Sequence, residues 1–216
     1  ILALGTVCDI MPLTDENRIF VKRGLRRLTN STNLGINALK KALGLDGKPI
    51  EVHHLSFRIG PSLNSTGRLE SAKEGVELLL TDDPARAESL AQDMAKLNEL
   101  RKEMTDRGVR AATDWVRKDI RMIPTEDGVK EKKIGDDKVI VLYMPGIHES
   151  IAGLIASKLK EAFYRPTLVF TDAENGHGLK GSGRSIETYN MFDKLCEHKE
   201  LFVKVGGHPM AAGFTI

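Results

Sequence analysis

Asp9 is the first of several residues whose type and position could support chemistry. It follows an apolar run, residues 1–7, that the sequence predicts to be a buried strand. Open α/β sheets bind ligands at the carboxyl ends of their strands, and carboxylates are the ligands that Mg²⁺ prefers there. Asp9 is therefore a candidate ligand of Mg²⁺ or Mn²⁺. The alternative is an aspartate that only stabilises the turn, since one carboxylate does not make a metal site.

A second candidate is a short segment rich in phosphate-binding groups. Residues 181–185 read Gly-Ser-Gly-Arg-Ser and combine backbone N–H groups, two hydroxyls and the Arg184 guanidinium just before a predicted helix. This composition suits a phosphate. The alternative has Ser185 as the helix N-cap and Arg184 in an unrelated ion pair. Residues 64–68 have a similar composition, for which a solvated loop is the alternative.

Histidines occur in two settings that call for opposite interpretations. His208 lies in a glycine-rich turn, residues 206–213, where the backbone could approach a ligand closely, although a lone histidine is usually structural. His53 and His54 are adjacent on a segment predicted to be extended, so their side chains should point in opposite directions. We therefore reject this pair as a metal or catalytic site.

The elements that must position these residues follow from hydrophobic periodicity and from helix start signals. We expect residues 57–69 to form an irregular loop, because they are dense in Gly, Pro, Ser and Asn. Residues 126–138 should form a surface loop or hairpin. Helices are predicted over residues 15–28, 35–43, 72–80, 149–163 and 188–196, and strands over residues 139–143, 167–170 and 179–185.

The longest periodic element begins at Pro84 with Asp83 as its N-cap, and its apolar pattern continues past Gly108 to Val116. A long amphipathic helix suits a connector between two lobes. Gly108 is a weak point in it, worth about 1 kcal/mol against the helix relative to Ala. The sequence therefore predicts an α/β protein with two lobes joined by a helix.

Composition limits the class of protein. The chain has 216 residues, 41% hydrophobic and 29% charged, as in an ordinary globular protein, and its net charge of +2 argues against nucleic-acid binding by bulk charge. Two cysteines and no apolar run of membrane-spanning length favour a reducing, cytoplasmic setting with no membrane partner. The first residues are apolar and lack an initiator Met, so we expect a fragment of a longer protein.

Five segments, taken in order, resemble the successive motifs of the RecJ family of single-stranded-DNA-specific exonucleases, members of the DHH phosphoesterase superfamily. They are ALGTVCDIMPL at residues 3–13, FRIGPSLNSTGRL at 57–69, GIHESIAGLIAS at 146–157, SGRS at 182–185 and GGHPMAAGF at 206–214.

The resemblance implies a fold, a reaction and partners. Residues 1–80 would be the carboxyl-terminal edge of a parallel-sheet DHH catalytic lobe, residues 81–121 a connector helix, and residues 122–216 a smaller α/β DHHA1 lobe that binds nucleic acid. The complete protein would hydrolyse single-stranded DNA from its 5′ end in DNA repair and recombination, using two Mn²⁺ or Mg²⁺ ions. A helicase or a single-strand-binding protein would be candidate partners in the cell.

The resemblance also implies roles for individual residues. Asp9 would be the last aspartate ligand of the metal cluster, and Arg68, Ser182 and Arg184 would hold the 5′-terminal phosphate, with His208 facing the cleft. The resemblance places the Asp-His-His metal-binding motif upstream of Ile1, outside this sequence. The pair His53 and His54 is not that motif, because Val52 stands where the Asp would be. We therefore expect this chain to retain no metal pair and to be inactive alone.

Two alternatives remain open. One is a DHH-family phosphodiesterase that acts on short oligoribonucleotides or cyclic dinucleotides, and the other is a non-catalytic module like the tail of alanyl-tRNA synthetase.

Overall fold

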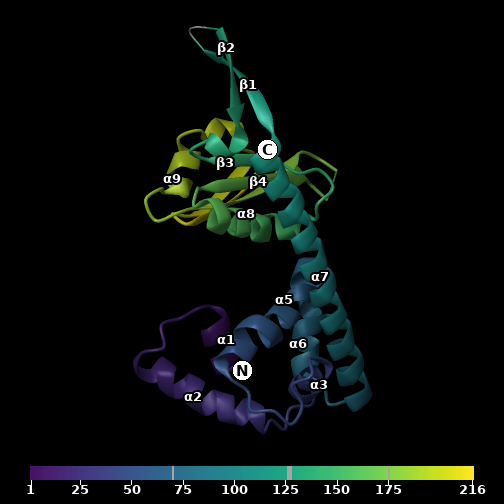
Figure 1. Cartoon of the computed structure of the whole chain (residues 1–216). Coiled ribbons are helices and arrows are strands. Elements are labelled where there is room, and N and C mark those ends of the chain that lie inside the picture. The colour runs from purple at the N-terminus through teal and green to yellow at the C-terminus, as the bar shows by residue number, and fades with distance from the viewer. Residues whose placement is uncertain (70, 126–127, 175) are drawn as a thin grey trace. The chain divides into compact units, whose positions relative to one another are not determined.

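The computed structural model describes residues 1–69, 71–125, 128–174 and 176–216, which divide into two compact units, Ile1–Arg101 and Lys102–Ile216 (Figure 1). The regular elements described in residues 1–101 are all helical, whereas the second unit combines helices with a five-stranded sheet. The predicted α/β class is therefore confirmed. Among the described residues, no helix is both long and apolar enough to cross a membrane.

The first unit is built on one hydrophobic core, which includes Leu39, Leu55, Leu78 and Met94. The helices predicted over residues 15–28, 35–43 and 72–80 are present with small shifts at their ends. The elements of this unit are α1 (Leu2–Cys8), α2 (Asp15–Thr29), α3 (Leu34–Ala42), α4 (Val52–His54), a π-helical turn (Leu55–Ile59), α5 (Gly60–Leu69) and α6 (Ala72–Leu80).

The predicted strand over residues 1–7 is wrong, because this segment forms α1. Ala3, Leu4 and Val7 are buried at helical spacing, so one face of the helix enters the core. The Thr6 hydroxyl donates to the carbonyl of Leu2, one turn earlier, at 2.9 Å. A short apolar run fits either a strand or a helix, and packing decides between them here.

The predicted irregular loop over residues 57–69 is also wrong, because it is helical throughout. The π-helical turn precedes α5, and the N–H of Gly60 bonds to the carbonyl of Leu55, five residues back. Pro61 has no N–H to donate, so it is tolerated close to this local change in the hydrogen-bond pattern. Ser62, Ser65 and Thr66 are buried and donate their hydroxyls to backbone carbonyls, which satisfies them inside the helix.

Helix α7 (Pro84–Lys118) begins as predicted, with the Asp83 carboxylate accepting from the N–H of Ala85 at 2.9 Å. It passes through Gly108 without interruption. In the second unit Gly108 packs against α8 (Glu149–Phe163), since a Cβ added to it would lie 2.5 Å from Cδ1 of Ile155. The glycine therefore serves close helix packing as well as weakening the helix.

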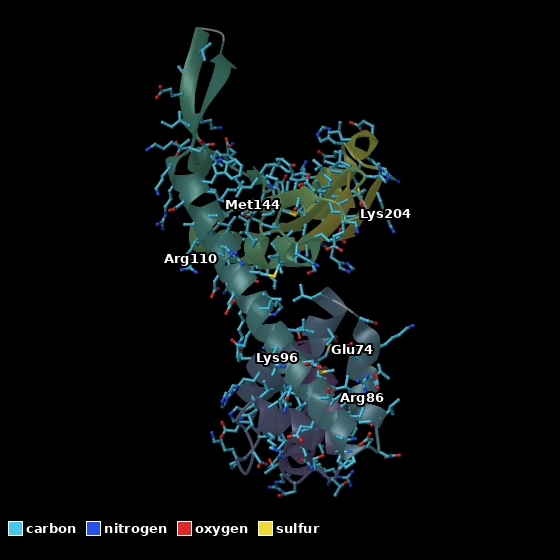
Figure 2. The ribbon with its side chains drawn as sticks, turned by 90° about the vertical axis from the view of Figure 1, so that its right-hand side faces the viewer. Glu74, Arg86, Lys96, Arg110, Met144 and Lys204 are labelled. Carbon is cyan, nitrogen blue, oxygen red and sulfur yellow. The ribbon has the colours of Figure 1, made fainter. Side chains whose placement is uncertain are left out.

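The sheet of the second unit has the strand order β3-β4-β5-β7-β6, with β3 and β4 parallel and the other neighbours antiparallel. Figure 2 shows Met144, just after β3, and Lys204, on β6, toward opposite edges of this sheet. The strands are β3 (Ile140–Tyr143), β4 (Thr167–Asp172), β5 (Leu179–Arg184), β6 (Lys204–His208) and β7 (Ala211–Thr215), and α9 (Met191–Cys196) and 3-10 turns at Ile134–Asp136 and Lys199–Leu201 complete the unit.

Two local predictions for this unit are refined. Strands β1 (Ile120–Thr125) and β2 (Gly128–Lys133) form a hairpin where a loop or hairpin was expected, with residues 126 and 127 outside the described part. Gly206, Gly207 and His208 belong to strand β6, so the predicted turn is displaced to Pro209 and Met210.

Candidate nucleic-acid interface

Strands β5, β7 and β6 bring three of the predicted site residues onto one face of the sheet. Arg184 pairs with Ala211, which pairs in turn with His208, so these residues form one row across the strands. Ser182 lies two residues earlier on β5, in the next row on the same face. It pairs with Gly213, which pairs in turn with Gly206. Side chains directly opposite on antiparallel strands share a face, and strands are about 4.8 Å apart, so the backbones at Arg184 and His208 are roughly 10 Å apart.

Helix α8 covers part of this same face. A Cβ added to Gly153 of α8 would lie 2.8 Å from Oγ of Ser182 and 2.8 Å from Nη2 of Arg184. The ammonium of Lys180, in the third row, contacts the Glu149 carboxylate at the start of α8 at 2.6 Å. Ser182, Arg184 and Lys180 therefore all point to the α8 side.

Beyond α8 the face is open and smooth. A Cβ added to either Gly206 or Gly213 would meet no atom within 4 Å. His208 and Lys204 are exposed at the edge of the sheet on β6. The backbone of a nucleic acid can approach the sheet closely where glycines leave no side chains. The surface therefore suits a nucleic-acid strand, because positive and hydrogen-bonding side chains of the protein flank the glycines on both sides.

The Arg184 guanidinium is partly buried and anchored by its own strand. Its Nη1 donates to Oγ of Ser182 at 3.1 Å and to the carbonyl of Gly183 at 2.8 Å. Ser185, proposed in one reading as a helix N-cap, is buried and donates its hydroxyl to the carbonyl of Tyr189, while Asn190 caps α9. The N-cap alternative for this segment is therefore wrong.

The start of α8 holds a polar cluster that sequence reasoning quoted in a motif but gave no role. Nδ1 of His148, the N-cap, accepts from the N–H of Ser150 at 3.2 Å, so Nε2 carries the proton of the neutral ring. Nε2 lies 3.0 Å from Oε1 of Glu174. The hydroxyl of Thr171 donates to the carbonyl of Ile147 at 2.7 Å and ties this loop to β4. The motif at residues 146–157 was the sequence signal that could have pointed to this cluster.

Glu149 has a shifted pKa in this cluster. Burial raises the pKa of its carboxyl, but hydrogen bonds from the Lys180 ammonium and the Glu174 backbone N–H, with the charges of Lys180 and His148, lower it more. The net pKa lies below the ordinary value. Glu149 is therefore a carboxylate that links α8 to β5.

Asp9 is exposed and follows helix α1, so the predicted position at the end of a strand is wrong. Its N–H bonds to the carbonyl of Gly5, and the next residue, Ile10, has a φ of 54°, which a β-branched residue rarely adopts. Among the described residues, no group of three or more His, Cys, Asp or Glu side chains could hold a metal ion. The described residues therefore do not form a metal site around Asp9.

Arg68 lies on α5, in the first unit, and its side chain is outside the described part of the chain. The hydroxyls near it in sequence, on Ser65 and Thr66, are buried and bonded to carbonyls within the helix. The hydrogen-bonding capacity of these hydroxyls as donors is therefore used within the protein.

His53 and His54 form a helical turn, not the extended segment that was expected. Nδ1 of His54 accepts from the N–H of Glu51 at 3.1 Å, and Nδ1 of His53 lies 3.2 Å from the Glu51 carboxylate. Desolvation, followed by the charge of His53, lowers the pKa of His54. These contacts give the pair a structural role at the start of α4.

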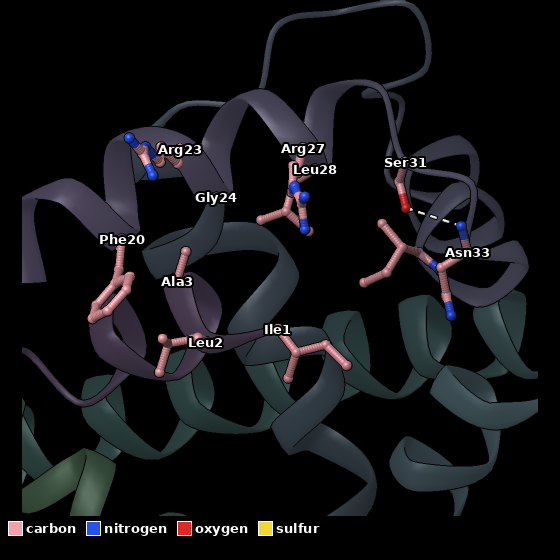
Figure 3. A pocket seen from close by; sticks show the side chains of 11 residues that line it. Ile1, Leu2, Ala3, Phe20, Arg23, Gly24, Arg27, Leu28, Ser31 and Asn33 are labelled. Atoms are coloured by element: carbon pink, nitrogen blue, oxygen red, sulfur yellow. Dashed lines mark hydrogen bonds between the residues drawn. The ribbon is translucent and has the colours of Figure 1, made fainter.

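The first unit has a pocket between α1, α2 and the start of α3 (Figure 3). Apolar side chains such as Leu2 and Phe20 line it together with Arg23 and Arg27, and the N–H of Asn33 donates to Oγ of Ser31 at 3.1 Å. The described lining includes none of the residues selected from the sequence.

Comparison with known proteins shows what the second unit resembles. Residues 136–216 match the model of the DHHA1 domain family. This segment is similar to DHHA1 domains. Over 99–100% of its length the chain is also 36% identical to the single-stranded-DNA-specific exonucleases RecJ of Bacillus subtilis and Escherichia coli, and 35% identical to that of Thermus thermophilus. The resemblance to RecJ is therefore confirmed along the chain.

Solved structures of RecJ proteins also resemble this chain. A RecJ structure from Thermus thermophilus in complex with Mg²⁺ matches this chain with a TM-score of 0.81 and 31% identity. The match covers 99% of this chain and 30% of the RecJ chain. An exonuclease RecJ bound to manganese matches with a TM-score of 0.78 and 32% identity, over 49% of that chain. The chain spans 25%, 36% and 28% of the length of the Bacillus, Escherichia and Thermus relatives.

Proposed function

We propose that this chain is part of a metal-dependent exonuclease that degrades single-stranded DNA from its 5′ end, in DNA repair and recombination. The observation that carries the proposal is the pair Ser182 and Arg184 on β5, beside the open glycine surface of β7 and β6. Similarity to proteins named as single-stranded-DNA-specific exonucleases supports the same substrate.

In this proposal the sheet face binds the sugar-phosphate backbone and Arg184 binds the terminal phosphate. A guanidinium and a hydroxyl form charge-assisted hydrogen bonds to phosphate oxygens, and holding the strand end fixes which bond is presented for hydrolysis. His208 and Arg68 supply further contacts. Aromatic residues are only 5% of the chain, so backbone contacts dominate base stacking and binding is largely independent of sequence.

The proposed organisation has three parts. Residues 1–80 belong to the DHH catalytic lobe, residues 81–121 are the connector, which contains helix α7, and residues 122–216 form the nucleic-acid-binding lobe. The complete protein works in the cytoplasm on single-stranded DNA, with a helicase or single-strand-binding protein as partner. This chain alone is inactive, because it supplies at most one ligand of the metal centre.

That ligand is Asp9, and the metal is Mn²⁺ or Mg²⁺. Two solved RecJ structures that resemble the chain contain one or the other of these ions. The Asp9→Ala variant of the complete protein should lose its Mn²⁺-dependent nuclease activity and bind Mn²⁺ more weakly by calorimetry. Normal turnover at saturating Mn²⁺ would rule out the assignment.

The decisive experiment compares 5′-phosphorylated and 5′-hydroxyl strands as substrates of the complete protein. Arg184→Ala should reduce the rate on phosphorylated strands by roughly ten- to a hundredfold, the value of a charged hydrogen bond, and should affect hydroxyl strands far less. Arg110→Ala is the matched control, because Arg110 is exposed on α7 and bonds to the carbonyl of Asp106. Equal loss on both strands would contradict a terminal-phosphate role.

A further inference from the structure

The position of the Arg184 guanidinium depends on a residue of another element. Arg184 is on β5, but its Nη2 and Cζ lie 2.8 and 3.3 Å from the place where a Cβ of residue 153 would be. The same Cβ would lie 2.8 Å from Oγ of Ser182. Carbon does not approach nitrogen or oxygen this closely without strain, so a side chain at position 153 and the present arrangement of Ser182 and Arg184 exclude each other.

We propose that Gly153 is a positioning residue for the phosphate-binding pair Ser182 and Arg184. The missing side chain leaves the space in which the guanidinium lies against α8 while Nη1 bonds to Ser182 and to the carbonyl of Gly183. This inference rests on the proposed function and adds a residue that never touches the DNA.

The helix itself does not require glycine at this position. Gly153 lies in the second turn of a 15-residue helix, where Ala is favoured over Gly by intrinsic propensity. No positive φ is recorded for it, so its backbone conformation is available to any residue. Its neighbours Ala152 and Ala156 are buried and carry a methyl group. The atoms that a methyl group at 153 would displace are those of Arg184 and Ser182, which can rotate away at small cost to the fold.

Gly153→Ala should therefore move the guanidinium without unfolding the protein. The 216-residue chain is titrated, by fluorescence anisotropy, against oligothymidines labelled at the 3′ end and carrying either a 5′-phosphate or a 5′-hydroxyl. We expect the wild-type chain to prefer the phosphorylated strand, and Gly153→Ala to lose that preference by roughly tenfold, as Arg184→Ala does.

Gly75→Ala on α6 is the matched control, because its added Cβ would lie at ordinary contact distances of 3.6 Å and 3.8 Å from its neighbours. It should keep the full preference. Thermal unfolding is followed for each variant, since a purely structural role would lower stability and weaken binding of both strands equally. That equal weakening would overturn the proposal.

The outcomes also separate this proposal from the proposed function. If Arg184→Ala loses the preference and Gly153→Ala keeps it, the positioning role is wrong and the phosphate role of Arg184 stands. If wild type shows no preference, the proposed phosphate site fails and the positioning role fails with it. If Gly153→Ala does not fold, Gly153→Ala with Ser182→Ala removes one of the two close contacts. That double variant should discriminate less than Ser182→Ala alone, and equal discrimination would overturn the proposal.

Discussion

The carboxylate of Glu149 joins the first turn of α8 to strand β5 through its 2.6 Å contact with Lys180. It also accepts the N–H of Glu174 at 3.3 Å, so one side chain fixes three segments around the candidate interface. Because the net pKa of Glu149 is lowered in the folded protein, folding favours its charged form.

Replacing Glu149 by Gln should lower the melting temperature at neutral pH by about 2–4 °C, corresponding to a loss of about 1 kcal/mol in a chain of this size. The contribution of Glu149 is fully present above the unfolded pKa, about 4.3, and is lost as the pH falls through the lower folded pKa. Thermal unfolding at pH 7 and at about pH 3 measures both cases, and the difference between variant and wild type should shrink in acid.

Glu161→Gln provides the matched control for this pH dependence. Glu161 lies on the same helix and forms an exposed pair with Lys158, so its substitution should change stability little at either pH. A destabilisation by Glu149→Gln that is as large at pH 3 as at pH 7 would show that packing, not charge, explains the effect.

Local chemistry allowed Ser182, Arg184 and His208 to be selected from the sequence, since the glycines and polar groups lie close together along the chain. The register that places Arg184 and His208 in one row depends on pairing between β5, β7 and β6. Gly153 and Glu149 could not have been joined to this site, because their contacts depend on how α8 packs on the sheet.

At the scale of elements, two of the errors have the same origin. Residues 1–7 and 57–69 were assigned from composition, which favoured a strand for the first and a loop for the second. Both are helices because their buried faces, such as Ala3 with Val7 and Ser62 with Ser65, pack into the unit's interior. The helix that begins at Pro84, which has a clear start signal, and the helix that begins at Asp15, which has a periodic apolar stripe, were predicted well.

The contact between α7 and α8 allows a test of packing at Gly108. Gly108→Ala should stabilise α7 by about 1 kcal/mol through propensity, but its methyl group would overlap Ile155, where overpacking costs about 1–3 kcal/mol. A net destabilisation is expected. Adding Ile155→Val removes Cδ1, the nearest atom, so the double variant should be more stable than either single variant.

Urea unfolding of the four proteins in this cycle measures the coupling between the two positions. Ile155→Val alone should cost about 0.5–1.5 kcal/mol, because it removes a buried methyl group. Additive effects of the two substitutions would show that Gly108 and Ile155 do not compete for the same space.

For the whole molecule, the net charge of +2 limits how it can hold a polyanion. Among the described residues, the hydrophobic cores of the second unit contain no residue from the first. If the second unit binds DNA as proposed, a few placed cations in that unit hold the strand, and the net charge of the entire chain contributes little. Binding through so few cations would release few counterions from the DNA.

The salt dependence of binding tests this argument directly. If about two or three cations contact phosphates of a single strand, the logarithm of the association constant should fall against the logarithm of salt concentration with a slope of about −1.4 to −2.1. Arg184→Ala should make the slope shallower by about 0.7, whereas the exposed Arg110→Ala should leave it unchanged. Anisotropy titrations with an oligothymidine over a roughly tenfold range of NaCl give all three slopes. A wild-type slope steeper than about −4 would mean that many dispersed charges bind the strand, because six or more phosphate contacts would then be required.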